Sequence, residues 1–384
     1  MKITAVEAIR LAYGRGLNWV VVRLESDVGI IGLGEASHTG ADDLTIGAII
    51  DHIAPTILGK EIEPIEAAVR LRRGLNGPLR PPPGYSPLTS AASGVEQALW
   101  DLHARTLGLP LAAALGGRLR DRVPLYANVN RGILDRSADS FAAAAKLAIG
   151  EGFSAVKIAP FDEASRSLTP SEASQALGTG IERIEAVRDA VGPDPGVLID
   201  CHGRFDRASG ARVARMLEPL DPYWLEEPVR WEEDPSGLEA IAKATSIPIA
   251  AGELLVGSAP YLSMVTNGAV DIVMTDVQHC GGVATVRAVA SICEAARRPL
   301  SLHNPAGPVG TLVSAHLAAA TPGIGLLEYP VSERRRSIVT ELAGEAENVV
   351  GGEMHLSNAP GIAVELSSEA VARHGSVRRA VAGA

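Results

Sequence analysis

The sequence predicts a (β/α)8 barrel preceded by a smaller α+β domain, and three observations support this fold class. From Val123 onward, eight short apolar runs alternate with amphipathic stretches. Every run ends in a polar residue, and the intervals between successive polar ends are 29, 43, 26, 27, 23, 27 and 25 residues. A barrel of this type needs roughly 30 residues for each strand and helix pair. Before Val123, strand patterns are followed by helical patterns, which indicates a separate domain.

The N-terminal domain begins with strands and continues with helices. In the first forty residues, two β-rich runs lie on either side of the turn sequence SDVG. Helical patterns then extend from about residue 43 to residue 115, and the last of them ends in a double glycine, which is typical of a helix C-terminus. We therefore expect an α+β domain over residues 1–120 and a barrel domain over residues 121–340.

The barrel strands are expected at the runs VPLYANVN, AVKIAP, GVLIDCH, YWLEEPV, IPIAAGE, IVMTDVQ, PLSLHN and GLLEYP. Their polar ends are Asn128, Lys157, Asp200, Glu226, Glu253, Asp276, His303 and Glu328. The 43-residue interval contains FDEASRSLTPSEASQALGTG, which we expect to form an extended loop before the next helix. Doubly wound sheets also alternate strands and helices, but they rarely sustain eight units with a polar residue at each strand end.

Composition excludes several classes of protein. The net charge of -10 and the pI near 5.5 argue against nucleic-acid binding and against anionic membrane surfaces. Three cysteines, none in a CxxC pair, make a disulfide framework or a thiolate zinc site unexpected. We find no signal peptide pattern and no run near the ~20 apolar residues of a membrane span. We therefore expect a cytoplasmic protein without nucleic-acid or membrane partners.

Three acidic residues at successive strand ends suggest a metal site. Because all barrel strands deliver their C-terminal ends to one face, Asp200, Glu226 and Glu253 should meet there. Three carboxylates in one apolar mouth need a counter-charge, and a hard divalent cation with oxygen ligands supplies it. An all-oxygen set favours Mg²⁺. A single acid would more often be a helix cap or a surface ion pair, but three in register favour the metal.

The remaining strand ends suggest a base and a cation. Asp276 should lie near His303, where a carboxylate orients the imidazole and raises its pKa, so that the pair can act as a general base. A solitary histidine here would more often be structural. Lys157 is either a simple strand-end cation or a group that stabilises substrate charge, and the residues alone leave both readings open.

His202 follows Asp200 by two positions in LIDCHGRF. Side chains at i and i+2 of a strand point to the same side, so Asp200 and His202 are expected to share one space.

These motifs together resemble the mandelate racemase subgroup of the enolase superfamily. The resemblance rests on ALWDLHARTLGLPLAAALGG, DCHGRF, WLEEP, AAGE, TDVQHCGG, LHNPAGP and LLEYP in that order, and it extends to NAPGIAVEL near the C-terminus. It implies an α+β capping domain over a modified (β/α)7β barrel, in which one barrel helix is missing. It also implies that the C-terminal segment, residues 341–384, returns to the cap.

The resemblance implies roles for the strand-end residues. Asp200, Glu226 and Glu253 correspond to the ligands of one Mg²⁺ per subunit, and Asp276 and His303 correspond to the Asp-His dyad. The implied reaction removes the proton α to the carboxylate of a small-molecule acid, through an enediolate that the Mg²⁺ holds. A weak carbon acid needs such concentrated positive charge. Glu328 corresponds to an acid that hydrogen-bonds the substrate near the metal, and the family is usually homo-oligomeric.

Two departures from mandelate racemase refine the reaction. The K-x-K pair of the racemase is Lys157, Ile158 and Ala159 here, so only the lysine that neutralises the substrate carboxylate is kept. A base on only one face disfavours simple racemisation. His202 resembles the histidine that protonates the departing hydroxyl in acid-sugar dehydratases such as galactonate dehydratase, although a structural role beside the metal is the alternative.

The first expectation is therefore a Mg²⁺-dependent dehydratase of a sugar acid that gives a 2-keto-3-deoxy acid. The second is a sugar-acid epimerase or cycloisomerase of the same fold. The third is a degenerate member that binds metal and ligand without turnover. The N-terminal loops around YGRGLN and SHTG are expected to close over the substrate, with Arg15 or His38 meeting its far end. The aromatic content of 4% mildly favours a hydroxylated substrate over an aryl acid.

Overall fold

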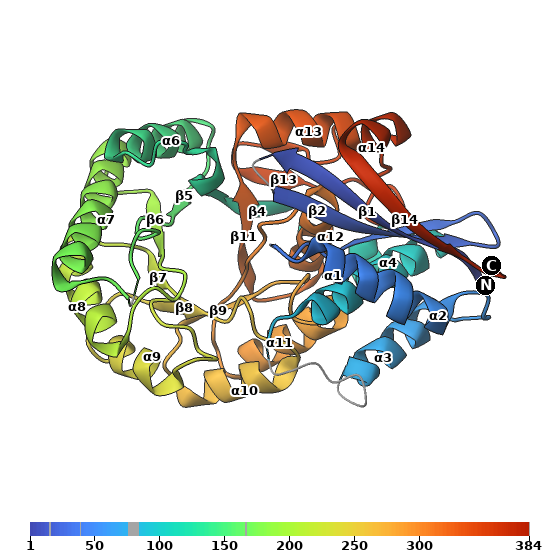
Figure 1. Cartoon of the computed structure of the whole chain (residues 1–384), viewed down its shortest axis with the longest axis horizontal. Coiled ribbons are helices and arrows are strands. Elements are labelled where there is room, and N and C mark those ends of the chain that lie inside the picture. Colours follow the sequence, from blue (N-terminus) through green and yellow to red (C-terminus); the bar gives the residue numbers. More distant parts are fainter. Residues whose placement is uncertain (15–16, 39, 76–83, 166, 384) are drawn as a thin grey trace.

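The computed structural model describes residues 1–14, 17–38, 40–75, 84–165 and 167–383. A closed barrel and an N-terminal antiparallel sheet lie beside one another (Figure 1). Among the described residues, no helix is long and apolar enough to cross a membrane.

The N-terminal sheet is antiparallel and takes one strand from the other end of the chain. Its order is β14-β1-β2-β3, with β1 (Ile3–Gly14), β2 (Leu17–Ser26), β3 (Ile31–Glu35) and β14 (Gly375–Val381). The two β-rich runs around SDVG are thus confirmed as β2 and β3. The C-terminal segment returns to this sheet because β14 pairs with β1 over its whole length.

Helices follow the third strand, and several of them pack on the N-terminal sheet. They are α1 (Asp42–Gly47), a π-helical turn (Ala48–Ile53), α2 (Ala54–Ile57), α3 (Pro64–Leu75), α4 (Pro87–Thr106) and α5 (Leu111–Ala114). The long helix α4 packs directly on β3. A Cβ atom at Gly32 or Gly34 would overlap the backbone of α4, so glycine permits this close approach.

The eight predicted barrel strands are all confirmed, and β11 pairs with β4 to close the sheet. They are β4 (Arg122–Asn128), β5 (Ala155–Ile158), β6 (Gly196–Asp200), β7 (Trp224–Glu226), β8 (Ile249–Ala251), β9 (Ile272–Thr275), β10 (Leu300–Leu302) and β11 (Ile324–Pro330). Their neighbours pair in parallel. One buried apolar residue from each of β4 to β9 forms a separate cluster that fills the interior, as barrels require: Tyr126, Ala155, Leu198, Trp224, Ala250 and Met274.

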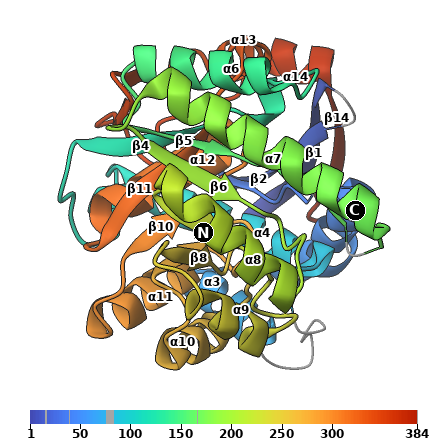
Figure 2. The same ribbon diagram turned by 90° about the vertical axis from the view of Figure 1, so that its left-hand side faces the viewer.

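Seven helices follow the first seven barrel strands and lie around the outside of the barrel (Figures 1 and 2). They are α6 (Ala138–Gly150), α7 (Pro170–Val191), α8 (Arg207–Leu217), α9 (Pro235–Ala242), α10 (Ser258–Asn267), α11 (Val283–Ala295) and α12 (Pro308–Ala320). After β11, α13 (Glu333–Ala343) packs on β1 and α14 rather than completing a regular eighth unit. Short elements complete the chain: 3-10 turns at Asn130–Gly132 and Glu218–Leu220, β12 (Val349–Val350), β13 (Glu353–His355) and α14 (Ser368–His374).

The prediction of a long loop over FDEASRSLTPSEASQALGTG was wrong in its second half, because α7 begins at Pro170. The hydroxyl of Thr169 accepts a hydrogen bond from the backbone of Glu172, and the Glu172 carboxylate accepts one from the backbone of Thr169. This capping box, followed by proline in the first turn, starts the helix early.

The two sheets meet through buried hydrogen bonds. The Glu35 carboxylate at the end of β3 accepts from the backbone of Gly307 at 2.7 Å and of Gly310 at 2.8 Å, at the start of α12. Gln278, after β9, accepts from the backbone of Ser37. The N-terminal domain therefore covers the loops that follow the C-terminal ends of β9 and β10.

Candidate active site

Three carboxylates meet at the C-terminal ends of β6, β7 and β8. Asp200 and Glu226 are the last residues of adjacent strands and are register partners, and Glu253 lies just beyond β8. One oxygen from each lies within 4.8 Å of the others. The residues are only 2%, 0% and 4% exposed, so little water screens their mutual repulsion.

The electrostatics of this cluster fit a hard divalent cation. Burial raises the pKa of Glu226 to about 8, although Lys157 opposes the rise. The Oε2 atom of Glu253 is buried and has no hydrogen-bond donor among the described residues, although His303 Nε2 lies 3.2 Å from it outside hydrogen-bonding geometry. Mg²⁺ and similar cations prefer oxygen ligands. This cluster offers three carboxylates, and one of them has a buried oxygen without a hydrogen-bond partner among the described residues.

Lys157 supplies positive charge within the chain itself. Its Nζ lies 3.4 Å from Asp200 Oδ2, 2.9 Å from Glu226 Oε1 and 3.0 Å from Glu328 Oε2, and the residue is 1% exposed. Burial would lower the pKa of Lys157, but Glu226 and Glu328 outweigh burial and raise it well above its usual value. Lys157 is therefore charged, and it is more than a simple strand-end cation because it bridges three strands.

Glu328 at the end of β11 is held by several donors. Its carboxylate accepts hydrogen bonds from Tyr126 Oη at 3.1 Å, from the backbone of Asn304 at 3.1 Å and from the side chain of Asn128. Burial opposes ionisation, but Lys157 and His303 lower the pKa of Glu328 to about 2. Asn128, one of the polar strand ends, thus belongs to the same network.

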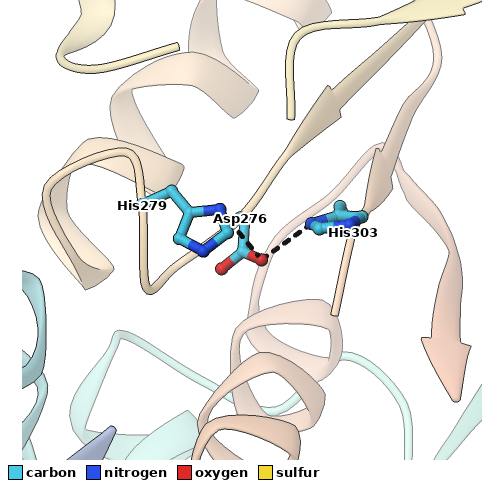
Figure 3. Close-up of side chains that lie close together, drawn as sticks. All are labelled: Asp276, His279 and His303. Carbon is cyan, nitrogen blue, oxygen red and sulfur yellow. Dashed lines mark hydrogen bonds and ion pairs between the residues drawn. The ribbon is translucent and has the colours of Figure 1, made fainter. Parts of the chain in front are cut away.

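His303 and Asp276 form a hydrogen-bonded pair (Figure 3). The His303 Nδ1 atom lies 2.8 Å from Asp276 Oδ2, and Nε2 faces Glu253. Burial lowers the pKa of His303, but the carboxylates of Glu253 and Glu328 and the bond to Asp276 raise it to about 10. The aspartate therefore orients the ring so that its second nitrogen points at the three-carboxylate cluster.

Sequence reasoning missed His279, which lies on the other side of Asp276 (Figure 3). Its Nδ1 is 3.5 Å from Asp276 Oδ2, and burial lowers the pKa of this imidazole. The backbone of His279 donates to the Asp276 carbonyl in a turn after β9. The i+3 spacing within TDVQHCGG was the available signal.

His202 lies beside Asp200, but the reason is not the predicted alternation of side chains along one strand. The strand β6 ends at Asp200, and His202 lies in the following turn with a left-handed backbone, φ = 49°. Its backbone donates to Asp200 Oδ1 at 3.0 Å, which holds this turn. The side chain therefore folds back, and Nε2 lies 3.1 Å from Asp200 Oδ2. The Asp200 carboxylate raises the pKa of His202 to about 11.

Arg230 is another residue that the sequence did not single out. Its Nη1 lies 2.8 Å from Glu227 Oε2 and 3.4 Å from Glu253 Oε1. The guanidinium thus balances the charge of Glu227, the second acid of EEP, and contacts one carboxylate of the three-carboxylate cluster. The signal was the sequence EEPVR, in which a cation follows two buried acids.

The N-terminal residues expected at the far end of the substrate are only partly described. Arg15 lies outside the described residues. The His38 ring stacks on Tyr85 with centroids 3.9 Å apart, and Tyr85 packs on His279 with centroids 4.3 Å apart. A stack of aromatic rings thus joins the N-terminal domain to the side of the Asp276 and His303 pair.

Comparison with known proteins identifies relatives over most of the chain. A model of the mandelate racemase / muconate lactonizing enzyme N-terminal domain matches residues 10–116, and an enolase C-terminal domain-like model matches residues 140–371. D-gluconate dehydratase of Thermoproteus tenax is 33% identical over 92% of this chain and 69% of its own length. D-xylonate dehydratase of Haloferax volcanii is 31% identical over 93% of this chain and 85% of its own length.

Solved structures agree with these matches. A member of the enolase superfamily from Salmonella Typhimurium superposes with a TM-score of 0.87 at 26% identity, over 99% of both chains. An enolase of the mandelate racemase subgroup from Agrobacterium tumefaciens superposes with a TM-score of 0.86 at 26% identity, over 100% of this chain and 99% of that one.

Proposed function

This chain belongs to the mandelate racemase / muconate lactonizing enzyme family of the enolase superfamily, and we propose that it is a Mg²⁺-dependent dehydratase of a sugar acid. One observation carries the proposal. Two imidazoles face the same three-carboxylate cluster, His303 through Nε2 beside Glu253 and His202 through Nε2 beside Asp200. An elimination needs a base and an acid at separate positions, and these two rings supply them.

Asp200, Glu226 and Glu253 would hold the metal. When bound, the cation supplies positive charge that stabilises the anion derived from the substrate carboxylate and offsets the Glu253 charge that raises the pKa of His303. Lys157 adds a fixed positive charge toward the substrate carboxylate. Glu328 would accept a hydrogen bond from the substrate, which would replace one of its present donors.

His303 would take the proton α to the carboxylate at Nε2. Asp276 accepts a hydrogen bond from Nδ1 and so holds the ring in this orientation. His202 would give its Nε2 proton to the β-hydroxyl as the carbon–oxygen bond breaks. The products are water and an enol, which converts to a 2-keto-3-deoxy acid. Ala159 stands where a racemase carries its second lysine, so the opposite face lacks that base.

The test separates proton abstraction from elimination. The wild-type protein is incubated with Mg²⁺ and a stereochemically complete set of sugar acids, and both 2-keto acid and α-deuterium uptake from D₂O are measured. His202→Asn should keep α-proton exchange while 2-keto acid formation falls by about 10²- to 10⁴-fold, the usual contribution of a general acid. The control His52→Asn, at an exposed position of the N-terminal domain, should change neither.

Other outcomes decide against the proposal. Exchange without 2-keto acid from any substrate would indicate the epimerase or cycloisomerase instead. Neither exchange nor product from any acid would indicate a member without turnover. Parallel loss of exchange and product in His202→Asn would assign His202 to the metal site.

A further inference from the structure

The loop after β5 brings a second carboxylate to His202. Asp162 Oδ1 lies 3.3 Å from His202 Nδ1, on the ring edge opposite the Nε2 that faces Asp200. The two residues are 40 positions apart in the chain. The arrangement parallels that of Asp276 and His303, in which a carboxylate holds Nδ1 and leaves Nε2 toward the metal-ligand cluster.

The loop that carries Asp162 is firmly anchored. Arg183, on α7, is 4% exposed and donates to the backbone carbonyls of Arg136 and Pro160 as well as to both oxygens of Glu163. The Phe161 ring is buried against Gly180, where any Cβ would overlap it. The position of Asp162 is therefore set by packing on both sides of it.

Asp162 itself is oriented by a cation. Its Oδ2 lies 2.8 Å from Arg136 Nη2, which also donates to the carbonyl of Ala159. With one oxygen committed to Arg136, the other is directed at His202. Asp162 is thus fixed as an acceptor for the Nδ1 proton, and this contact selects the ring orientation of the His202 side chain, which is 38% exposed.

We propose that Asp162 is the positioning residue of His202, so that this enzyme has an Asp-His pair for the acid step as well as one for the base step. The inference rests on the proposed dehydratase function. In the elimination, the Nε2 proton of His202 passes to the β-oxygen and the carbon–oxygen electron pair leaves with water. The enediolate electron pair becomes the new carbon–carbon double bond, and the remaining ring proton stays on Nδ1 against Asp162.

The test compares two leaving groups in the same variant. The substrates are the sugar acid that the wild-type protein dehydrates and its analogue with fluorine in place of the β-hydroxyl, because fluoride leaves with much less need for protonation. Asp162→Asn should lower water elimination by about 10- to 100-fold, as loss of a supporting partner commonly does. Fluoride elimination and α-proton exchange should stay close to wild type, and Asp162→Glu should recover part of the lost rate.

Asp189→Asn is the matched control. It makes the same change of side chain at an exposed position near the end of α7. This variant should lower neither elimination. If Asp162→Asn and Asp189→Asn have equal effects, or if Asp162→Asn slows both leaving groups equally, the contact between Asp162 and His202 is only structural and the inference is overturned.

The outcome also separates this inference from the proposed function. If His202→Asn loses water elimination selectively while Asp162→Asn does not, only the role of Asp162 fails. If wild-type protein forms no 2-keto acid from any sugar acid, the dehydratase itself fails, and the inference fails with it.

Discussion

Replacing Lys157 by methionine tests how the chain stabilises its acidic cluster. The substitution keeps a long apolar stem but removes the only ammonium group that the structure places within 3.4 Å of Asp200, Glu226 and Glu328. All four residues are at most 2% exposed, so water cannot replace the lost charge. Removing one partner from a buried ion pair costs about 3 to 5 kcal/mol, and we expect a loss of that size in metal-free protein.

The loss should depend on metal and on pH. A divalent cation restores positive charge, so Mg²⁺ should stabilise the variant more than the wild type. The difference in unfolding free energy between the two proteins should therefore become smaller. Burial already raises the pKa of Glu226 to about 8 against the opposing effect of Lys157, and without Lys157 the pKa rises further. When the folded pKa of a carboxyl group lies above its unfolded value, the protein loses stability as the pH rises toward the folded pKa. Wild type and variant share this loss up to about pH 8, and above it only the variant keeps losing stability, so the deficit of the variant should be larger at pH 9.5 than at pH 7.

The assay is urea unfolding of both proteins in EDTA and in saturating Mg²⁺, at both pH values. Lys243→Met is the control, because Lys243 is exposed and pairs with Glu239 at the surface of α9. It should leave the midpoint nearly unchanged. Equal midpoints for wild type and Lys157→Met in EDTA, or a gap that Mg²⁺ does not narrow, would refute the electrostatic reasoning.

Two further predictions concern the imidazoles. His303→Asn should reduce α-proton exchange and turnover together by about 10²- to 10⁴-fold, whereas Asp276→Asn should reduce both less, and retained exchange in His303→Asn would transfer the base role elsewhere. His316, buried on α12, has a pKa lowered to about 4 by burial. As the pH falls, this histidine is therefore protonated at a higher pH in the unfolded chain than in the folded protein. The wild type should therefore lose about 2 kcal/mol of stability from this group between pH 7.5 and pH 5, and His316→Asn should abolish that part of the urea-midpoint shift.

The strand ends were predictable because they follow from a repeated local pattern. Parallel strands in a closed barrel all point their C-terminal ends to one face, so the order of polar residues along the chain predicts their meeting in space. Asp200, Glu226 and Glu253, which end or follow adjacent strands, lie together for this reason. The neighbouring ends of β9 and β10 bring Asp276 to His303 by the same rule.

Residues in loops were predicted less well. The start of α7 was not predicted, because the 43-residue interval between Lys157 and Asp200 indicated a long loop. The capping box of Thr169 and Glu172 marks the start of the helix within that interval. His202 was placed near Asp200 for an incomplete reason, since a left-handed turn rather than strand alternation directs its side chain. Arg15 lies outside the described residues, so its expected contact with the substrate stays a prediction.

The sequence by itself determined the fold class, the family resemblance and the set of acids and bases at the barrel mouth. Hydrophobic periodicity and strand-end polarity are local properties, and eight repeats of them leave few alternative folds. Only the tertiary structure decided which partner each polar group meets. Asp162 reaches His202 through a loop held by Phe161 and Arg183, and Lys157 bridges three strand ends. Such contacts depend on loop conformation and side-chain packing between segments distant in the chain, for which no periodic signal exists.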